Sequence, residues 1–435
     1  MQSRQTAQTG QTGQMGTGQT RQAIVNARLF DSASGLLRPH STLVIEGERI
    51  VAVTQEPLHV DDAAVIDVGG RVVLPGLIDA HVHVVAASHD LVGLALQPAS
   101  LIGAQSSHIM RGMLQRGFTT VRDVAGADFG LQEAVARGLY DGPRLFIACQ
   151  PISQTGGHAD MRPMGVSGGR SGGGMFCSCA GLGLVGAIAD GVGEVRRAVR
   201  EQVRNGANHI KIMAGGGVSS PTDPIDGTQF SIEELRAAVE EAEAANLYAL
   251  AHAYSPRAVT RAVLAGVRSI EHGNLIDEAT VRLMKTHGTY LVPTLSTYAA
   301  LADEGQRLGW SAAMLDKLQG VQSRGLEAVM LAHAEGVPLV FGTDLLGHMH
   351  ARQSGEFALR AVALTAVEIL QSATITAARL MRQEAHIGQL VVGAFADLLV
   401  VDGDPTQELS MLAEPERGIR LLMQGGRTVR GNLVA

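Results

Sequence analysis

Short apolar runs alternate with amphipathic helical stretches through the middle of the chain. Runs of strand length fall at residues 77–83, 119–124, 144–149, 209–213, 248–252, 269–272, 289–293 and 339–344. The helical pattern at 231–242 opens with Ser-x-x-Glu, the signature of a capping box. Repeated strand–helix order predicts parallel strands joined by crossover helices, and eight such units predict an α/β fold of the (β/α)₈ barrel type, with insertions.

The sequence pattern differs near both ends of the chain, where short runs typical of β-strands are separated by turn residues. Such runs lie within 23–74 and again within 388–435, where residues 388–393 form the first of them. They predict one small composite β-sandwich domain built from both chain ends, flanking a barrel at 75–387. Residues 1–22 repeat Gln, Thr and Gly, which predicts a disordered or expression-derived tail. This tail lacks the apolar core of a secretory signal, so we expect a cytoplasmic protein, with a removed export signal as the alternative.

The composition favours small-molecule chemistry. The chain has 435 residues, of which 46% are hydrophobic, enough for a full core, and its apolar runs are too short to cross a membrane. A net charge of -7 offers no basic surface to nucleic acid. Three cysteines, Cys149, Cys177 and Cys179, are an odd number, and the C-x-C spacing of the last two suits neither a disulfide framework nor a structural zinc site. We therefore expect no nucleic-acid partner and no membrane partner.

Residues that can bind metal close several of the predicted strands. His81 and His83 are two positions apart on one strand, so both point to the same face. Later strands end at Lys211, His252, His272 and Asp344. In a barrel these positions lie at the C-terminal face, where catalytic groups gather. One histidine alone is ordinarily a core or surface residue, but four at strand ends favour a metal site.

Two of these residues indicate more than simple coordination. Lys211 projects alone from a buried strand, where a lysine must pair or lose its charge. A neutral lysine can react with carbon dioxide to give a carbamate, whose two oxygens can bridge two metals; a salt-bridged core lysine is the alternative. Asp344 can accept a proton from metal-bound water, or it can cap the following helix.

The chain resembles the amidohydrolase superfamily, in the branch of imidazolonepropionase-like zinc dipeptidases and bacterial ochratoxin A amide hydrolases. The resemblance runs from Ile24 to the C-terminus and rests on the His-x-His after Pro-Gly-Leu-Ile-Asp and on the motifs at 117–123, 210–216, 270–273 and 396–398. It implies two Zn²⁺ ions, with another divalent transition metal as the alternative. His81 and His83 would bind the more buried ion, and His252 and His272 the more exposed one. Lys211, carboxylated on its amine, would bridge both, and Asp344 would be a ligand and proton shuttle.

The resemblance also implies how the substrate is held. Similar dipeptidases place a histidine and a tyrosine beside the scissile carbonyl, at the positions of His158 and Tyr254 here. Ser88 and His348 lie in the loops after the first and last predicted strands and are further candidates for substrate contacts. The glycine-crowded segment 155–183 is expected to be a mobile flap over the site, with a plain surface excursion as the alternative.

Together these implications predict a binuclear zinc amidohydrolase. A metal-bridging hydroxide would cleave the amide of a dipeptide or N-acyl amino acid that has a free C-terminal carboxylate. The resemblance makes ochratoxin A, split into ochratoxin alpha and phenylalanine, a specific candidate substrate. The alternatives are hydrolysis of a lactone, cyclic amide or phosphoester at the same site, and a non-catalytic assembly protein that keeps the barrel. Relatives imply a homo-oligomer, with an octamer as one candidate size.

Overall fold

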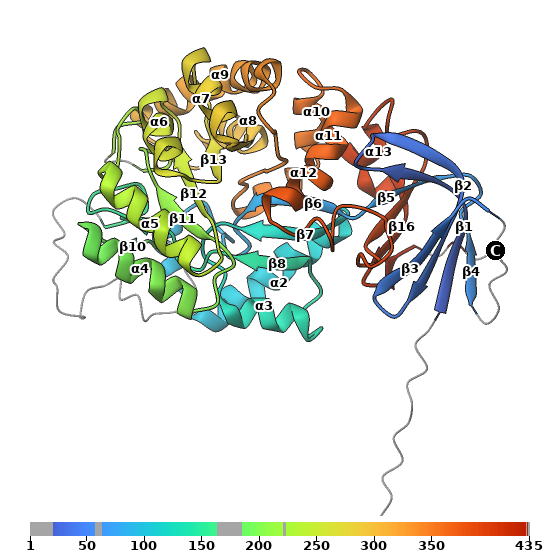
Figure 1. Cartoon of the computed structure of the whole chain (residues 1–435). Coiled ribbons are helices and arrows are strands. Elements are labelled where there is room, and N and C mark those ends of the chain that lie inside the picture. The colour runs from blue at the N-terminus through green and yellow to red at the C-terminus, as the bar shows by residue number, and fades with distance from the viewer. Residues whose placement is uncertain (1–20, 57–62, 163–184, 221–222, 432, 434–435) are drawn as a thin grey trace, which may run out of the picture.

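Parallel strands and helices alternate through the central part of the protein, and a β-rich part lies beside them (Figure 1). The structure, a computed structural model, describes residues 21–56, 63–162, 185–220, 223–431 and 433. The central strands are β6 (Leu77–Val82), β7 (Phe118–Asp123), β8 (Arg144–Ile147), β9 (Ile152–Ser153), β10 (Ala187–Ile188), β11 (Ile210–Met213), β12 (Ala249–Ala253), β13 (Ser269–His272) and β14 (Tyr290–Val292). All their pairings are parallel, as expected when helices connect successive strands.

The central strands form two hydrogen-bonded sheets that together make up the barrel. One has the order β6-β7-β8 and the other β10-β9-β11-β12-β13-β14. β8 and β9 follow each other in the chain and together occupy the place of one barrel strand. A bend at Cys149, whose φ is 60°, separates them. The backbone amide of Asn208, just before β11, donates to the carbonyl of Ile147 at 2.7 Å and so connects the two sheets on this side.

The eighth predicted strand, 339–344, connects the sheets on the other side but is not a regular strand. Val340 donates its amide to Leu291 of β14 at 2.9 Å, and Asp344 donates to His81 of β6 at 2.8 Å. The hydrogen bonding to the neighbouring strands is interrupted in the middle of this segment, because groups from outside the sheet bond to its backbone there. The Val340 carbonyl accepts from the Arg360 side chain at 3.0 Å, and the Phe341 amide donates to the Ser372 carbonyl at 3.1 Å.

Helices follow the barrel strands in chain order, and most of them cover the outside of the barrel (Figure 1). They are α1 (Leu91–Ala95), α2 (Ala99–Gln115), α3 (Phe129–Ala136), α4 (Val192–Arg204), α5 (Ile232–Ala244), α6 (Pro256–Ala265), α7 (Glu278–His287), α8 (Leu295–Glu304), α9 (Ala312–Glu335), η1 (Gly347–Arg352), α10 (Gly355–Arg360), α11 (Ala366–Ser372) and α12 (Ile375–Leu380). The predicted capping box at the start of α5 is present: the Ser231 hydroxyl accepts from the Glu234 amide, and the Glu234 carboxylate accepts from the Ser231 amide. Within the described residues, no helix is both long and apolar enough to cross a membrane.

Strands from both ends of the chain share one eight-stranded sheet. They are β1 (Arg21–Asp31), β2 (Leu36–Glu46), β3 (Arg49–Thr54), β4 (Ala64–Asp67) and β5 (Val72–Pro75), followed by β15 (Leu398–Val401), β16 (Ile419–Gln424) and β17 (Arg427–Arg430). Two short helices, α13 (Ser410–Ala413) and α14 (Pro415–Gly418), lie between β15 and β16. The two sets meet where β5 pairs antiparallel with β15, and they share a core in which Ile24 and Leu43 pack with Leu398 and Met423. The fold is therefore α/β, a (β/α)₈ barrel joined to a small β-structure from both chain ends.

Two details of this β-structure differ from the sequence prediction. β1 begins at Arg21, so the last two residues of the predicted tail belong to a strand, because they pair with Ile45 and Glu46 of β2. Residues 388–393 form turns instead of a strand. Positive φ angles of 74° at Gly388 and 92° at Gly393 bend the backbone at both ends of this run.

Candidate metal centre and active site

One cavity of about 710 Å³ opens at the C-terminal ends of the barrel strands. It is lined by every predicted metal ligand, namely His81, His83, Lys211, His252, His272 and Asp344. His158 and Tyr254 line it as well, together with apolar side chains such as Leu301 and Leu346. Residues from strands far apart in the sequence thus converge because parallel barrel strands all end at the same face.

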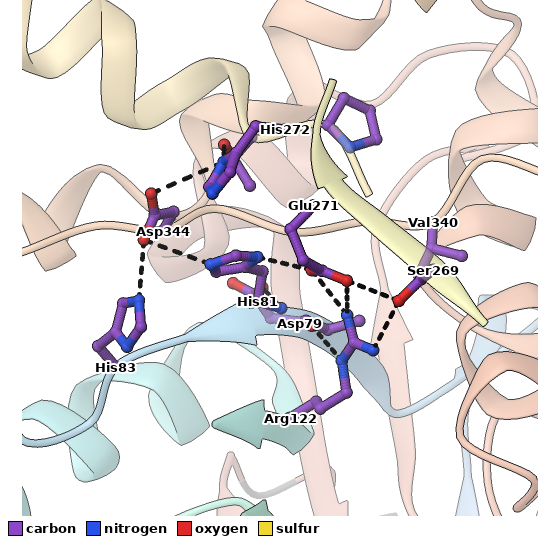
Figure 2. Close-up of polar contacts among 12 residues, drawn as sticks. Asp79, His81, His83, Arg122, Ser269, Glu271, His272, Val340 and Asp344 are labelled. Atoms are coloured by element: carbon purple, nitrogen blue, oxygen red, sulfur yellow. Dashed lines mark hydrogen bonds and ion pairs between the residues drawn. The ribbon is translucent and has the colours of Figure 1, made fainter. Parts of the chain in front are cut away.

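His81, His83 and Asp344 form a compact group of possible metal ligands (Figure 2). One ligand atom from each lies within 4.8 Å of the others. His83 Nε2 is 3.1 Å from Asp344 Oδ1, and His81 Nε2 is 3.5 Å from the same oxygen. The His83 Nδ1 nitrogen donates to the Ala125 carbonyl at 3.0 Å, which leaves Nε2 as the nitrogen that faces the group.

Glu271 orients His81 from the side away from the cavity. Its carboxylate accepts from His81 Nδ1 at 2.7 Å, so the Nε2 lone pair is free to bind a metal. Arg122 donates to both oxygens of this carboxylate, at 2.9 and 2.8 Å, and Ser269 donates to one of them at 2.6 Å. Burial raises the pKa of Glu271, but Arg122 and His81 outweigh it and hold that pKa well below its usual range. A charged Glu271 therefore selects one orientation and one tautomer of His81.

His252 and His272 complete a contiguous cluster of imidazoles. Their ring centroids are 4.7 Å apart, and His272 is 4.8 Å from His81. His252 Nε2 donates to the Gly216 carbonyl at 2.9 Å, which leaves Nδ1 unprotonated, and His272 Nδ1 lies 2.9 Å from Thr294 Oγ1. Burial lowers the pKa of both rings far below the usual value, with neighbouring cations adding to the shift. Neutral imidazole is the form that binds transition metals.

Lys211 reaches the same cavity from β11 and is 2% exposed. Burial lowers the pKa of its amine to about 8, while the charges of Glu271 and Asp344 act in the opposite direction. Those two carboxylates are already paired, Glu271 with Arg122 and Asp344 with the histidines. A lysine that has a sizeable neutral fraction near neutral pH has the reactivity that carbamate formation requires.

Two of the cavity residues have unusual backbone conformations. His272 has a φ of 73° and Asp344 a φ of 55°, both in the left-handed region that residues other than glycine rarely occupy. Such conformations are found at functional sites, where the surrounding structure holds them in place.

His158 and Tyr254 lie against the histidine cluster. The His158 ring stacks on His252 with centroids 4.4 Å apart and an angle of 23° between the rings. The Tyr254 hydroxyl accepts from the Tyr298 hydroxyl at 2.9 Å, and both tyrosines line the cavity. Burial raises the pKa of Tyr254, so its hydroxyl keeps its proton and remains a donor. Tyr298 lies in α8, the helix after β14, and no sequence motif marks it as a cavity residue.

The other predicted substrate contacts lie outside the residues that line this cavity. His348 pairs with Glu304, and its side chain is 63% exposed. The Ser88 hydroxyl accepts from the Asp90 amide at 3.1 Å. A substrate-binding role for Ser88 and His348 stays a prediction. Most of the predicted flap, together with Cys177 and Cys179, falls within 163–184 and lies outside the described residues.

Sequence reasoning did not assign roles to Arg122 and Glu271, although both lie in motifs that carried the resemblance. Each is a charged residue inside an apolar strand segment, and this pattern could have identified them. A charged side chain on a buried strand must have a partner. Both side chains are completely buried. Their partners could not be identified because they come from strands 149 residues apart.

Comparisons with known proteins agree with this geometry. The sequence model of the amidohydrolase family matches residues 72–429. Ochratoxinase from Aspergillus niger is 34% identical over 372 residues, which cover 83% of this chain and 76% of that protein. A crystal structure of a prolidase complexed with N-methylphosphonate-L-proline superposes with a TM-score of 0.91 at 47% identity, covering 95% of this chain and 100% of the other. A Xaa-Pro dipeptidase with bound methionine gives a TM-score of 0.84 at 29% identity, with coverage of 95% and 100%. The chain therefore belongs to the amidohydrolase family and is a hydrolase of amide or peptide bonds.

Proposed function

We propose that this protein is a binuclear zinc hydrolase that cleaves the amide bond of N-acyl amino acids or dipeptides with a free C-terminal carboxylate. The observation that carries the proposal is the convergence of six ligand-type side chains on one cavity. Within it, His81, His83 and Asp344 already place ligand atoms within 4.8 Å of one another. Similarity to an ochratoxinase and to a prolidase supports amide bonds as the target.

The donor set fits two divalent transition metals. Imidazole nitrogens and carboxylate oxygens are the ligands that zinc takes in catalytic sites. We assign His81 and His83 to the more buried ion and His252 and His272 to the other. Lys211, as a carbamate, would bridge them. When bound, such an ion pair lowers the pKa of water and polarises a carbonyl group.

The residues of the chain supply the proton transfers. Asp344 accepts a proton from the attacking water and delivers it to the leaving amine nitrogen. Burial raises its pKa, but the facing histidines, His81 first, outweigh burial and hold that pKa well below its usual range, so the carboxylate is ionised. Tyr254 and His158 face the same space and would donate hydrogen bonds to the oxygen of the scissile carbonyl.

The cavity favours a small substrate with an apolar side chain. The empty space of about 710 Å³ includes space open to solvent, so the side chains that line the cavity, and not its volume, indicate the kind of substrate. Apolar side chains line it beyond the polar cluster, among them Leu91, Met161, Val218, Leu301 and Leu346. An N-acyl phenylalanine fits this description, and ochratoxin A, which would give ochratoxin alpha and phenylalanine, is a specific candidate.

A substrate panel combined with metal analysis tests the proposal. We expect about two zinc ions per chain and release of the C-terminal amino acid from N-acyl phenylalanine, dipeptides and ochratoxin A. Chelation should stop turnover, and added zinc should restore it. Asp344→Asn should keep the fold and lose the activity. Turnover of lactones or phosphoesters alone would favour those reactions instead, and a chain that binds no metal would favour a non-catalytic role.

A further inference from the structure

The loop between β11 and α5 contacts two residues of the site. Its Gly216 carbonyl accepts the hydrogen bond from His252, and its Asp223 carboxylate lies 3.7 Å from the Nδ1 nitrogen of His158. A Cβ atom at Gly217 would lie 1.8 Å from His158 Cε1, so the ring occupies the space that any other side chain would fill. The position of this loop and the position of the His158 ring are therefore linked.

Asp223 is the centre of the contacts between the loop and His158. It is 5% exposed, and its Oδ2 oxygen accepts from the Gly217 amide at 3.0 Å and from Gln229 Nε2 at 3.1 Å. Gln229 in turn accepts from the backbone amide of His158 at 3.0 Å. Among the described residues, Asp223 Oδ1 and His158 Nδ1 are both buried without a hydrogen-bond partner. Asp223 therefore holds the loop and the backbone of His158 together.

Lys317 binds the same loop from the other side. It belongs to α9, the helix that follows α8 near the seventh barrel position. Its ammonium donates to the carbonyls of Asp223 at 2.6 Å and Ser220 at 2.9 Å, and the Gly217 carbonyl is 3.5 Å away. An ammonium group has three donors, and here three carbonyls of one loop surround it. The charge thus fixes the backbone at Asp223 and at two residues that precede it.

We propose that Lys317 and Asp223 are positioning residues that fix the His158 ring against the cavity. Lys317 holds the backbone of the loop, and Asp223 transmits that position to His158 through Gln229 and Gly217. The inference rests on the proposed function, because it assumes that the His158 ring acts on the scissile carbonyl. It assigns a role in the reaction to a lysine that does not line the cavity.

Kinetics and hydrogen exchange of the zinc-loaded protein test the inference. Lys317→Met should lower kcat by about tenfold or more, with little change in KM and in zinc content, because misplacing a reacting group weakens the transition state. Amides of residues 214–229 should exchange faster in Lys317→Met. Lys317→Arg should restore part of the activity. Lys285→Met is the matched control, since Lys285 donates to the Gly336 carbonyl at 2.8 Å at the other end of α9.

A double variant separates positioning from general destabilisation. If Lys317 acts through His158, adding Lys317→Met to His158→Asn should lower kcat no further than His158→Asn alone. Fully additive losses, an unchanged kcat, unchanged exchange of the loop, or an equal loss in Lys285→Met would each overturn the inference. A wild-type protein that hydrolyses no amide would refute the proposed function instead, and the exchange data would still decide whether Lys317 holds the loop.

Discussion

The Nδ1 nitrogen of His81 lies 2.7 Å from a carboxylate oxygen of Glu271, and both side chains are buried. The two residues come from β6 and β13, which are not neighbours in either central sheet. The contact therefore spans the interior of the barrel beneath the cavity. It couples the orientation of a predicted zinc ligand to the Arg122–Glu271 ion pair, which is fully buried as well.

Glu271→Gln should weaken both the fold and metal binding. It leaves the Arg122 guanidinium buried without a countercharge, which costs about 3–5 kcal/mol of unfolding free energy. Loss of the group that orients a metal ligand should also lower zinc affinity by about 10–100-fold. Chemical denaturation and competition with a zinc chelator measure the two effects. Glu133→Gln is the control, because Glu133 pairs with Arg137 on the surface at 2.6 Å, and its loss should cost at most about 0.5 kcal/mol.

Lys211→Ala should strongly reduce turnover and prevent the binding of two zinc ions. In the proposed two-metal site Lys211 would supply the shared ligand, and its loss should lower activity by about a hundredfold or more. Short carboxylic acids such as propionate should restore part of it by occupying the vacated space and supplying two oxygens. Propanol is the neutral control of similar size. A Lys211→Ala protein that is fully active without zinc would refute the two-metal proposal.

Gly217→Ala should lower activity without removing metal. Its φ is not in the left-handed region, so the substitution is penalised by contact with the His158 ring and not by the backbone. Displacement of that ring should reduce kcat by about tenfold or more, while zinc content stays at the wild-type level. Gly193→Ala is the control, since nothing lies within 4 Å of a Cβ atom at that position. Equal kcat values for the two variants would show that the ring position does not matter.

Acidification should destabilise the protein through His209. Burial lowers the pKa of this histidine to about 3, with Arg122 adding to the shift, whereas the unfolded chain binds the proton near pH 6.5. Between these values the unfolded state binds more protons, so stability is retained above about pH 6.5 and lost as the pH falls. At pH 5 the loss from His209 alone should be about 2 kcal/mol. Denaturation of metal-free protein at pH 7.5 and 5 measures it, and His209→Phe should show a correspondingly smaller loss.

The convergence of the candidate ligands on one cavity could largely be predicted from the sequence, because these residues lie at strand ends. Side-chain alternation places His81 and His83 on one face, and the parallel order of the strands brings Lys211, His252 and Asp344 to the same end of the barrel. The paired ends of the chain were predictable for a similar reason, since both have β-type patterns. The local sequence pattern was enough for a prediction wherever the position of a residue along a strand determines the direction of its side chain.

Contacts between distant segments could not be predicted in this way. The pattern at 339–344 suggests a strand, but Arg360 and Ser372 take hydrogen bonds that a regular ladder would need. The pattern at 388–393 is apolar, yet Val392 is 63% exposed because two glycines turn the chain. Asp223 and Lys317, 94 residues apart, carry no local signal of their contact. These features depend on tertiary neighbours and not on residue periodicity.

The sheet shared by both chain ends has a consequence for biosynthesis. Gln22 Nε2 donates to the Gly426 carbonyl at 2.8 Å, across 404 residues of sequence, and β5 completes its hydrogen bonds only with β15. During translation β5 therefore emerges from the ribosome long before its partner exists, leaving an open strand edge that can pair with other chains. Chaperones that cover such edges should matter more for the yield of this protein than for that of a barrel alone.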